Sequence, residues 1–383
     1  MLTRKVIEQR EREILAPYAS LSEESRGRMY PSKEHPLRTD FQRDRDRIVH
    51  SASFRRMEYK TQVFIPHETD HFRTRLTHTI EVAQISRTFA RILRLNEDLA
   101  EAIALVHDVG HTPFGHSGED VLADLLKDFG GFNHNRQSLR IVDLLEQRYE
   151  EHPGLNLSYE VREGIVKHET KNKKIPDEFY PDENPTLEAA LVDVADEITY
   201  NAHDIDDGLS SGIITPDDLK QLKFWKYLQL ESLVSSMDSK DDKKRYKLIR
   251  SLLDFMVTDV VNETKLRLVH YDIQSLEEVR ETDEKLCDYS DANSLIVYDI
   301  KKFLSEKLYN HPKLITMSDW AEEIIQYLFG YFIQQSDKLP SRFQEMLLTE
   351  EKEIVIADYI AGMTDRYAIN LYDRLQSVES GMK

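Results

Sequence analysis

The sequence predicts a mainly α-helical protein, and three observations support that prediction. Apolar residues recur every three to four positions over several long stretches, which is the period of a helix that buries one face. The 383 residues include only 13 Gly and 12 Pro, too few for the many tight turns that a sandwich of short strands needs. No series of segments alternates between apolar and polar residues, so helices packed on helices are the expected architecture.

The N-terminal part is expected to combine an exposed helix with a charged segment. Met1 to Leu15 is rich in Arg and Glu and lacks the apolar core of a signal peptide. A loop follows at Tyr30 to Pro36. From Arg38 to Arg47 the charges alternate in sign, which is typical of a solvated, salt-bridged face. Phe41 and Ile48 indicate that part of this segment packs, and the other interpretation is an arm that reaches a substrate or a neighbouring subunit.

One short strand and a series of helices are predicted in the middle of the chain. The strand is Thr61 to Ile65, which ends at Pro66. Helical periodicity predicts the helices 76–95, 97–106, 118–127, 133–150 and 186–203. Between the last two, Lys167 to Pro185 has the composition of a mobile charged loop.

The pattern remains helical after Gly208. The predicted helices there are 243–268, 319–333 and 354–372. The longest near-apolar stretch, Ile324 to Ile333, is far too short to span a bilayer.

The bulk composition limits the classes of function. A formal net charge of −19 repels polyanions over long range and disfavours a general nucleic-acid-binding role. A small phosphate substrate is still allowed, because local cations and a metal ion can reverse the field within one pocket. The single cysteine, Cys287, cannot form an internal disulfide, which fits a reducing cytoplasm.

One stretch concentrates chemically active side chains. His107 to Glu119 reads HDVGHTPFGHSGE and holds three histidines and two carboxylates within thirteen residues. The helix predicted to end at Val106 places His107 and Asp108 at its terminus, where adjacent side chains can converge on one point. In the middle of a helix they would diverge by roughly 100°. Glycines and a proline then break regular structure, so a helix end followed by a turn that carries His111, His116 and Glu119 is a candidate chemical site.

Two further helices carry candidate metal ligands. His78 falls on the apolar stripe of helix 76–95, where a core histidine with a hydrogen-bond partner is the simpler interpretation. On helix 186–203, Asp196, Tyr200 and Asp204 recur at intervals of four along the edge of the apolar face. Two imidazoles and two carboxylates would suit a divalent ion such as iron, manganese, zinc or magnesium. Spacing alone does not join these residues.

A resemblance to a known protein family groups these residues into one site. His78, His107-Asp108 and Asp196 resemble the His…His-Asp…Asp signature of the HD-domain phosphohydrolase superfamily. An ordered set of blocks from Arg38 to Tyr367 resembles the deoxyguanosine triphosphate triphosphohydrolase family more closely. The blocks are RTDFQRDRDRIVH at 38–50, KTQVF at 60–64, RTRLTH at 73–78, HDVGHTPFGH at 107–116, GGFNHNRQS at 130–138, DEITYNAHD at 196–204 and AGMTDRY at 361–367.

The resemblance implies a fold and a domain order. It implies an HD-domain helical core with an extended N-terminal arm and a helical C-terminal half. The expected domains are an N-terminal arm and substrate-contacting segment at 1–72, the HD domain with its metal site at 73–207, and a helical C-terminal region at 208–383.

The resemblance also implies roles for site residues. One divalent metal ion, such as Mg, Mn, Fe or Zn, is expected on His78, His107, Asp108 and Asp196. His116 and Glu119 correspond to the catalytic pair of the family, with the histidine in acid–base or nucleophilic work and the glutamate orienting it. His111 is grouped with these catalytic residues, and it either binds phosphate, orients a ligand or is structural. The expected substrate-binding residues are Gln62, Arg75, His134, Asn135, Tyr200 and Asp204.

Alternatives to several of these roles come from the residues themselves. His116 and Glu119 would otherwise only cap the helix that follows, and His134 or Asn135 would cap the helix starting near Arg136. Arg75 would otherwise be a surface residue. Arg366 and Tyr367 resemble a family signature that lies either near the active site or at a subunit contact.

The implied activity is hydrolysis of a deoxynucleoside triphosphate, such as dGTP or several dNTPs, to a deoxynucleoside and inorganic triphosphate. Two alternatives remain: an HD phosphohydrolase acting on a monophosphate, a cyclic nucleotide or an alarmone, and a deoxynucleotide-binding regulatory protein with little turnover. Family members are commonly oligomeric, often hexameric, so a homo-oligomer is expected. Neither a membrane nor nucleic acid is expected as the main partner. The sequence leaves open the preferred base, the native metal and any separate regulatory nucleotide site.

Overall fold

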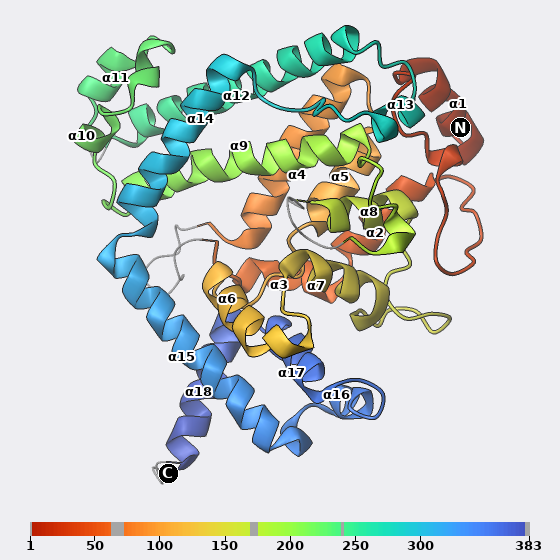
Figure 1. Ribbon diagram of the computed structural model, residues 1–383, viewed down its shortest axis with the longest axis vertical. Coiled ribbons are helices and arrows are strands. Elements are labelled where there is room, and N and C mark those ends of the chain that lie inside the picture. The colour runs from red at the N-terminus through yellow and green to blue at the C-terminus, as the bar shows by residue number, and fades with distance from the viewer. Residues whose placement is uncertain (1, 63–72, 169–174, 239–240, 380–383) are drawn as a thin grey trace. The chain divides into compact units, whose positions relative to one another are not determined.

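The structure is a computed structural model that describes residues 2–62, 73–168, 175–238 and 241–379 (Figure 1). Helices make up most of these residues, so the predicted mainly α fold is confirmed. Among the described residues, β pairing is limited to the isolated bridges Arg28–Ser158, Thr61–Thr74 and Gln147–Gly154. No helix within these ranges is long and apolar enough to cross a membrane.

The chain divides into two compact units, and each is assembled from three separate stretches of sequence. Unit 1 comprises Met1–Arg47, His78–Leu105 and Leu157–Leu314, and unit 2 comprises Ile48–Thr77, Val106–Asn156 and Ile315–Lys383. The domains expected from the sequence are continuous stretches, and their boundaries stay a prediction. So does the extended character of the N-terminal arm.

The helices that lie wholly or mainly in unit 1 are α1 (Arg4–Ile14), α2 (Asp40–Val49), α4 (Arg75–Leu93), α5 (Glu97–Val106), α8 (Tyr159–Lys167), α9 (Leu187–Ser210), α10 (Pro216–Leu219), α11 (Glu231–Ser235), α12 (Asp242–His270), α13 (Leu276–Glu281) and α14 (Asp291–Leu304). Those of unit 2 are α3 (Ala52–Arg56), α6 (His116–Leu125), α7 (His134–Arg140), α15 (Pro312–Gln334), α16 (Ser341–Met346), α17 (Lys352–Ala361) and α18 (Asp365–Glu379).

Helix α9 is the central helix of unit 1, and it packs against α12 (Figure 1). It begins after Thr186, whose side chain accepts a hydrogen bond from the Ala189 N–H and so satisfies one of the free donors of the first turn. Most residues of α9 are buried. On α12 the buried residues Leu248, Leu252 and Met256 recur every fourth position, which makes the stripe that faces inward.

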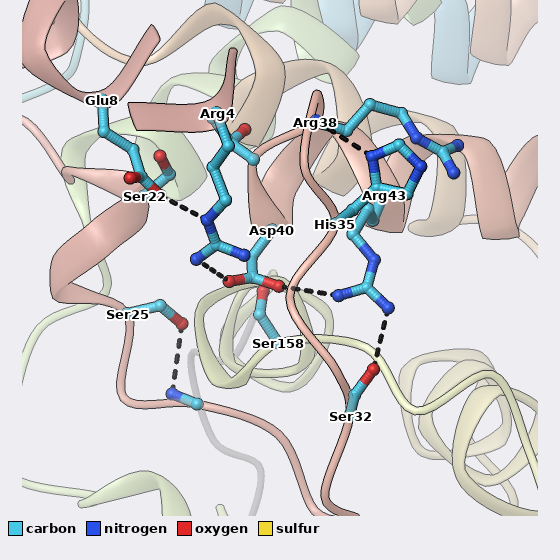
Figure 2. A network of polar contacts seen from close by, with 12 residues as sticks. Arg4, Glu8, Ser22, Ser25, Ser32, His35, Arg38, Asp40, Arg43 and Ser158 are labelled. Atoms are coloured by element: carbon cyan, nitrogen blue, oxygen red, sulfur yellow. Dashed lines mark hydrogen bonds and ion pairs between the residues drawn. The ribbon is translucent and has the colours of Figure 1, made fainter. Parts of the chain in front are cut away.

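The charged segment around α2 is paired within unit 1. Figure 2 shows the Asp40 carboxylate between two arginines: Arg4 Nη2 lies 2.8 Å from Oδ2, and Arg43 Nη1 lies 3.5 Å from Oδ1. Arg28 reaches Asp40 at 2.9 Å and also bonds Asp44, which is fully buried. The alternating charges are therefore salt-bridged as predicted, but part of the network is buried rather than solvated.

Unit 2 has its own apolar core, which joins distant parts of the sequence. The inward face of α6, with Val121 and Leu122, packs in one cluster with residues of α15, α17 and α18, among them Ile325, Ile356 and Leu371. The apolar cluster fixes α6, and α6 begins at His116. The predicted helix 319–333 is confirmed and extends further toward the N-terminus, as α15.

Two predicted helices end earlier than the periodicity indicates. The helix predicted over 354–372 is two helices, α17 and α18, because Gly362 ends the first and Thr364 caps the second by accepting from the Tyr367 N–H at 3.2 Å. The helix predicted over 133–150 stops at Leu145 in a π-helical turn. Glu146 then leaves the helical conformation, and its carboxylate accepts from Ser53 N and Oγ at 2.7 and 2.6 Å.

Two other predictions fall partly on residues outside the described ranges. Thr61 of the predicted strand 61–65 forms only an isolated bridge with Thr74, and residues 63–72 lie outside the described ranges. The predicted mobile loop 167–185 is wrong at Phe179, which is fully buried, and at Lys167, which closes α8 and is buried as well. Residues 169–174 of that loop lie outside the described part of the chain.

Candidate active site

In unit 2, Asp108 is the centre of a buried polar cluster. Arg75 Nη1 donates to its Oδ2 at 2.9 Å, and His111 Nε2 and His107 Nε2 lie 3.1 and 3.4 Å from its Oδ1. Burial opposes the charge, but His107, His111 and Arg75 together hold the pKa of Asp108 well below its ordinary value. Asp108 is therefore a carboxylate. Arg75 is buried, so the alternative that it is a surface residue is wrong.

Beside Asp108, three histidines gather around Glu119. The Glu119 carboxylate lies 2.9 Å from His134 Nδ1, 3.5 Å from His116 Nδ1 and 3.8 Å from His111 Nδ1. It also accepts from the His134 backbone N–H at 2.9 Å. The rings of His111 and His134 stack, with centroids 4.0 Å apart and planes 14° apart. Glu119 thus orients two histidines rather than one.

The electrostatics of this cluster distinguish its members. Burial would raise the pKa of Glu119, yet hydrogen bonds from His116 and His134 bring it well below the ordinary range. The hydrogen bond with Glu119 raises the pKa of His116. Burial and Arg75 lower the pKa of His111 well below its ordinary value. The cluster therefore favours the protonated form of His116 and the neutral form of His111.

A tight turn brings His116 into this cluster. Phe114 and Gly115 both have positive φ, +63° and +61°. A Cβ atom on residue 115 would lie 3.1 Å from Arg75 Nη2 and 3.7 Å from the Gln62 carbonyl oxygen, so Gln62 and Arg75 lie next to the turn. Gly110 lets α7 approach: a Cβ there would come within 2.2 Å of the His134 carbonyl oxygen.

The second set of predicted residues lies in unit 1, on α4 and α9. His78 Nε2 is 2.8 Å from Asp196 Oδ1, and its other ring nitrogen, Nδ1, is 3.4 Å from His203 Nδ1. His203 in turn hydrogen-bonds Glu81 through Nε2. His78 is therefore held between a carboxylate and a second imidazole.

His168, at the C-terminal end of α8, was missed by the sequence reasoning. Its Nδ1 hydrogen-bonds Asp193, and its Nε2 lies 3.6 Å from Asp196 Oδ2. Burial opposes protonation, but the two carboxylates raise the pKa of His168 well above its ordinary value. An isolated histidine in a charged stretch carries no spacing signal, so only the fold could reveal it.

Farther along α9, Tyr200 and Asp204 share a partner that the sequence did not indicate. The hydroxyl of Tyr309 donates to Asp204 Oδ2. Burial, together with Asp204 and Tyr200, raises the pKa of Tyr309 well above its ordinary value. The Asp204 carboxylate is fully buried, and any sugar hydroxyl would share it with Tyr309.

The N-terminus of α7 shows whether His134 or Asn135 caps this helix. Its N-cap is Asn133, whose side chain accepts from Asn135 N and Arg136 N, so capping by His134 or Asn135 is wrong. His134 instead faces Glu119. Asn135 is buried next to it, and its contact with a substrate stays a prediction.

Tyr367 is half exposed, and its hydroxyl lies 3.0 Å from that of Tyr359.

The predicted site residues thus fall into two sets. Unit 2 contains Gln62, Arg75, His107, Asp108, His111, His116, Glu119, His134 and Asn135. Unit 1 contains His78, Asp196, Tyr200 and Asp204. Within unit 2, ligand-type atoms of Asp108, His111 and His134, and of His111, His116 and Glu119, lie within 4.8 Å of one another.

Two family sequence patterns match the chain. The HD domain matches residues 75–201, a range that contains His78, His107, Asp108 and Asp196. The phosphohydrolase-associated domain matches residues 288–374. The expected HD-domain helical fold is therefore confirmed.

Relatives cover nearly the whole chain. A deoxyguanosinetriphosphate triphosphohydrolase-like protein of Geobacter sulfurreducens is 45% identical over 370 residues, which are 95% of this chain and 96% of its own. Proteins of the same name from an Azoarcus species and from Leptospira interrogans are 47% and 44% identical, over 95% and 96% of this chain and 97% of their own lengths. A crystal structure of a hypothetical protein from Aquifex aeolicus covers 78% of this chain and 79% of its own, at 19% identity and a TM-score of 0.32.

Proposed function

Because the chain belongs to the deoxyguanosinetriphosphate triphosphohydrolase-like family of HD-domain proteins, we propose that it hydrolyses a deoxynucleoside triphosphate to a deoxynucleoside and inorganic triphosphate, with a divalent metal ion. The observation that carries this proposal is the identity of about 45% over 95% of the chain. The cluster of Arg75, Asp108, His116 and Glu119 supplies the chemistry that such a reaction requires.

The proposed metal ligands are His78, His107, Asp108 and Asp196, and their grouping rests on the family. His78 and Asp196 belong to unit 1, and His107 and Asp108 to unit 2. Their chemistry fits a divalent ion: Asp108 is ionised, and His78 presents Nε2 to a carboxylate while its other nitrogen is supported by His203. An ion held there would polarise a phosphoryl oxygen and lower the pKa of an adjacent water.

The chain's own residues have separate tasks in the proposed reaction. A water oxygen bonds to the α-phosphorus and its proton is released to the solvent, while the bond from that phosphorus to the 5′-oxygen breaks. The 5′-oxygen is a poor leaving group, so it needs a proton. His116, whose pKa is raised by Glu119, is the proposed donor of that proton. Arg75, already next to the turn that carries His116, is suited to bind phosphate oxygens with the donors that it does not give to Asp108.

The remaining predicted residues are proposed to bind the nucleotide. Gln62 and Tyr200 would face the deoxyribose, Asp204 would accept from its 3′-hydroxyl, and His134 and Asn135 would line the pocket. His111 stacks on His134 and hydrogen-bonds Asp108. We propose that it holds the neighbouring histidine rings of the cluster in position. Assembly into a homo-oligomer stays a prediction.

Product analysis tests the proposed reaction. The purified protein is stripped with a chelator, reloaded with Mg, Mn, Fe or Zn, and incubated with each of the four dNTPs and with GTP. Liquid chromatography should show deoxynucleoside and triphosphate in equal amounts. Release of a monophosphate, or turnover of a cyclic nucleotide or an alarmone instead, would favour another HD phosphohydrolase. Tight binding of dNTP without any product would favour a regulatory protein.

Elemental analysis tests the metal ligands separately. His107→Ala and Asp108→Ala should each lose bound metal and activity together, because each removes one of only four proposed ligands. Asp124→Asn, at an exposed position of α6, should retain both. Full metal occupancy in both ligand variants would overturn the assignment.

A further inference from the structure

The turn that precedes His116 has a backbone conformation that its residues do not favour. Phe114 has φ +63°, in the left-handed region, which non-glycine residues rarely occupy, and Gly115 follows at +61°. Such a conformation persists only where the surroundings fix it. The turn ends at the first residue of α6, so its shape sets the position of the His116 ring relative to Glu119.

A buried carboxylate from α18 holds this turn. Asp365 Oδ1 accepts a hydrogen bond from the Phe114 N–H at 3.0 Å. Its Oδ2 accepts from the Thr61 N–H at 2.7 Å and from the Thr61 hydroxyl. Asp365 is 2% exposed, so water does not compete with these contacts. One carboxylate therefore fixes the amide at the strained residue and ties it to the Lys60–Thr61 segment.

Lys60 holds the other end of the same turn. Its ammonium group donates to the His111 carbonyl oxygen and, at 2.8 Å, to the Ala361 carbonyl oxygen. Lys60 is also 2% exposed, and burial lowers its pKa to about 7. The backbone between His111 and Phe114 is thus attached at both ends to Lys60, Thr61 and the junction of α17 and α18.

We infer that Asp365 and Lys60 are positioning residues, which hold the turn 111–115 so that His116 lies against Glu119 in the geometry that transfers a proton. The inference rests on the proposed function. It gives part of the segment matched by the phosphohydrolase-associated domain, residues 361–365, a role in the reaction of the HD domain. Neither side chain is proposed to touch substrate or metal.

Kinetics of Asp365→Asn test this inference. The amide keeps nearly the same shape but cannot accept from three donors as the carboxylate does. We expect kcat to fall about 10- to 100-fold, as for a catalytic group displaced by about 1 Å, with KM little changed. The alkaline limb of kcat should also move to lower pH, since a displaced His116 loses the contact with Glu119 that raises its pKa.

Glu146→Gln is the matched control. Glu146 is also a buried carboxylate of unit 2 that accepts from a backbone N–H and the hydroxyl of one residue, Ser53, but it does not contact the turn. We expect the control to lose as much thermal stability as Asp365→Asn but to keep the parent kcat and pH profile. Lys60→Met, which removes the donor to the His111 carbonyl, is the second test variant and should lower kcat in the same way.

Hydrogen exchange supplies a readout that does not depend on activity. Peptides covering residues 111–119 should exchange faster in Asp365→Asn and Lys60→Met than in the parent, but not in Glu146→Gln. If the parent forms no product from any dNTP, the proposed function fails while the exchange result still decides whether these residues hold the turn. The inference is overturned if exchange in 111–119, or kcat and its pH profile, matches the Glu146→Gln control in both test variants.

Discussion

His116 is the most exposed member of its cluster, with 75% of its side chain accessible to solvent. Its three neighbours, His111, Glu119 and His134, are buried. An exposed ring that contacts a buried carboxylate can exchange protons with water between turnovers and still be oriented. This combination suits a proton donor better than a helix cap, and the N-cap position of α6 is Gly115 rather than His116.

The pH profile of kcat tests this role of His116. Its pKa is raised by Glu119, so the protonated donor should persist to a higher pH than that of an ordinary histidine. Glu119→Gln removes the largest cause of the increase, so the alkaline limb should move to lower pH. His116→Ala should keep the fold and the metal but lose about 10²- to 10⁴-fold in kcat. Asp124→Asn, on the same helix, should leave the profile unchanged; a limb that stays in place in Glu119→Gln would contradict the assignment.

Asp204 and Tyr309 give a second test with an internal comparison. Asp204→Ala should lower kcat/KM for the deoxynucleotide about 10- to 150-fold, since a hydrogen bond to a charged group contributes about 1.5–3 kcal/mol. Tyr309→Phe removes the internal donor but leaves the carboxylate, so it should cost much less. Equal losses in the two variants would mean that Asp204 serves only to hold Tyr309.

The two turns of α9 that carry Tyr200 and Asp204 also give a prediction about selectivity for the sugar. If Tyr200 packs against carbon 2′, Tyr200→Ala should narrow the ratio of kcat/KM between a dNTP and the matching ribonucleotide. If the parent protein hydrolyses both equally well, the proposed pocket is wrong.

The residues that the sequence revealed share one property: they stand in short, ordered motifs. His107, Asp108, His116 and Glu119 lie within thirteen positions. Lys60, His168 and Tyr309 were not assigned a role, because each is a single polar residue whose significance comes from a partner far away in the chain. Burial of a lysine or a tyrosine hydroxyl is a tertiary property, and no local spacing encodes it.

At the scale of elements, hydrophobic periodicity predicts the bounds of a helix accurately where a local sequence signal marks the end of that helix. The predicted bounds of α5 match the structure, and those of α4 differ by only one or two residues. The break between α17 and α18 has a local signal too, Gly362 followed by the capping residue Thr364, but the apolar pattern continues through it. The π-helical turn after α7 ends at Leu145, next to Glu146, whose contacts with Ser53 a local pattern cannot contain.

The contact of α8 with α5 makes an element-scale prediction. A Cβ on Gly164 would lie 2.9 Å from the Ile103 side chain, closer than real Cβ contacts come. Gly164→Ala should therefore destabilise the protein by about 1–3 kcal/mol, measured by urea unfolding. When Gly164→Ala is combined with Ile103→Ala, the two losses in free energy of unfolding should be less than additive, because the shorter side chain at 103 no longer clashes with the new Cβ. Gly330→Ala is the control: a Cβ there meets nothing, and replacing a helical glycine should stabilise by about 0.5–1 kcal/mol.

At the scale of the whole molecule, each unit is discontinuous in sequence. Hydrophobic periodicity shows which faces are buried but not which stretches share a core, so this division could not be predicted. Its physical basis in unit 2 is the cluster that packs Val121 and Leu122 of α6 against helices that follow Ile315.

A shortened chain tests whether α6 depends on the helices that follow Ile315. A chain that ends at Leu314 lacks α17, α18 and nearly all of α15, so the apolar face of α6 loses the partners that these helices supply. We expect strong binding of the dye ANS and rapid hydrogen exchange in α6, while α9 and α12 stay protected, since they contact each other within unit 1. Protection of α6 equal to that of the full chain would show that its core contacts are dispensable.

The hydrogen bond between Asp365 and Phe114 also has a consequence for biosynthesis. The two residues are 251 positions apart. At about 5–20 residues per second, the ribosome makes the turn roughly 10–50 s before the carboxylate that holds it. From the synthesis of Asp196 until that of Asp365, the nascent chain carries every proposed metal ligand but an unsupported turn at His116. Ribosome-bound chains stalled before Asp365 emerges should show rapid exchange at residues 111–119, and chains stalled well after it should not.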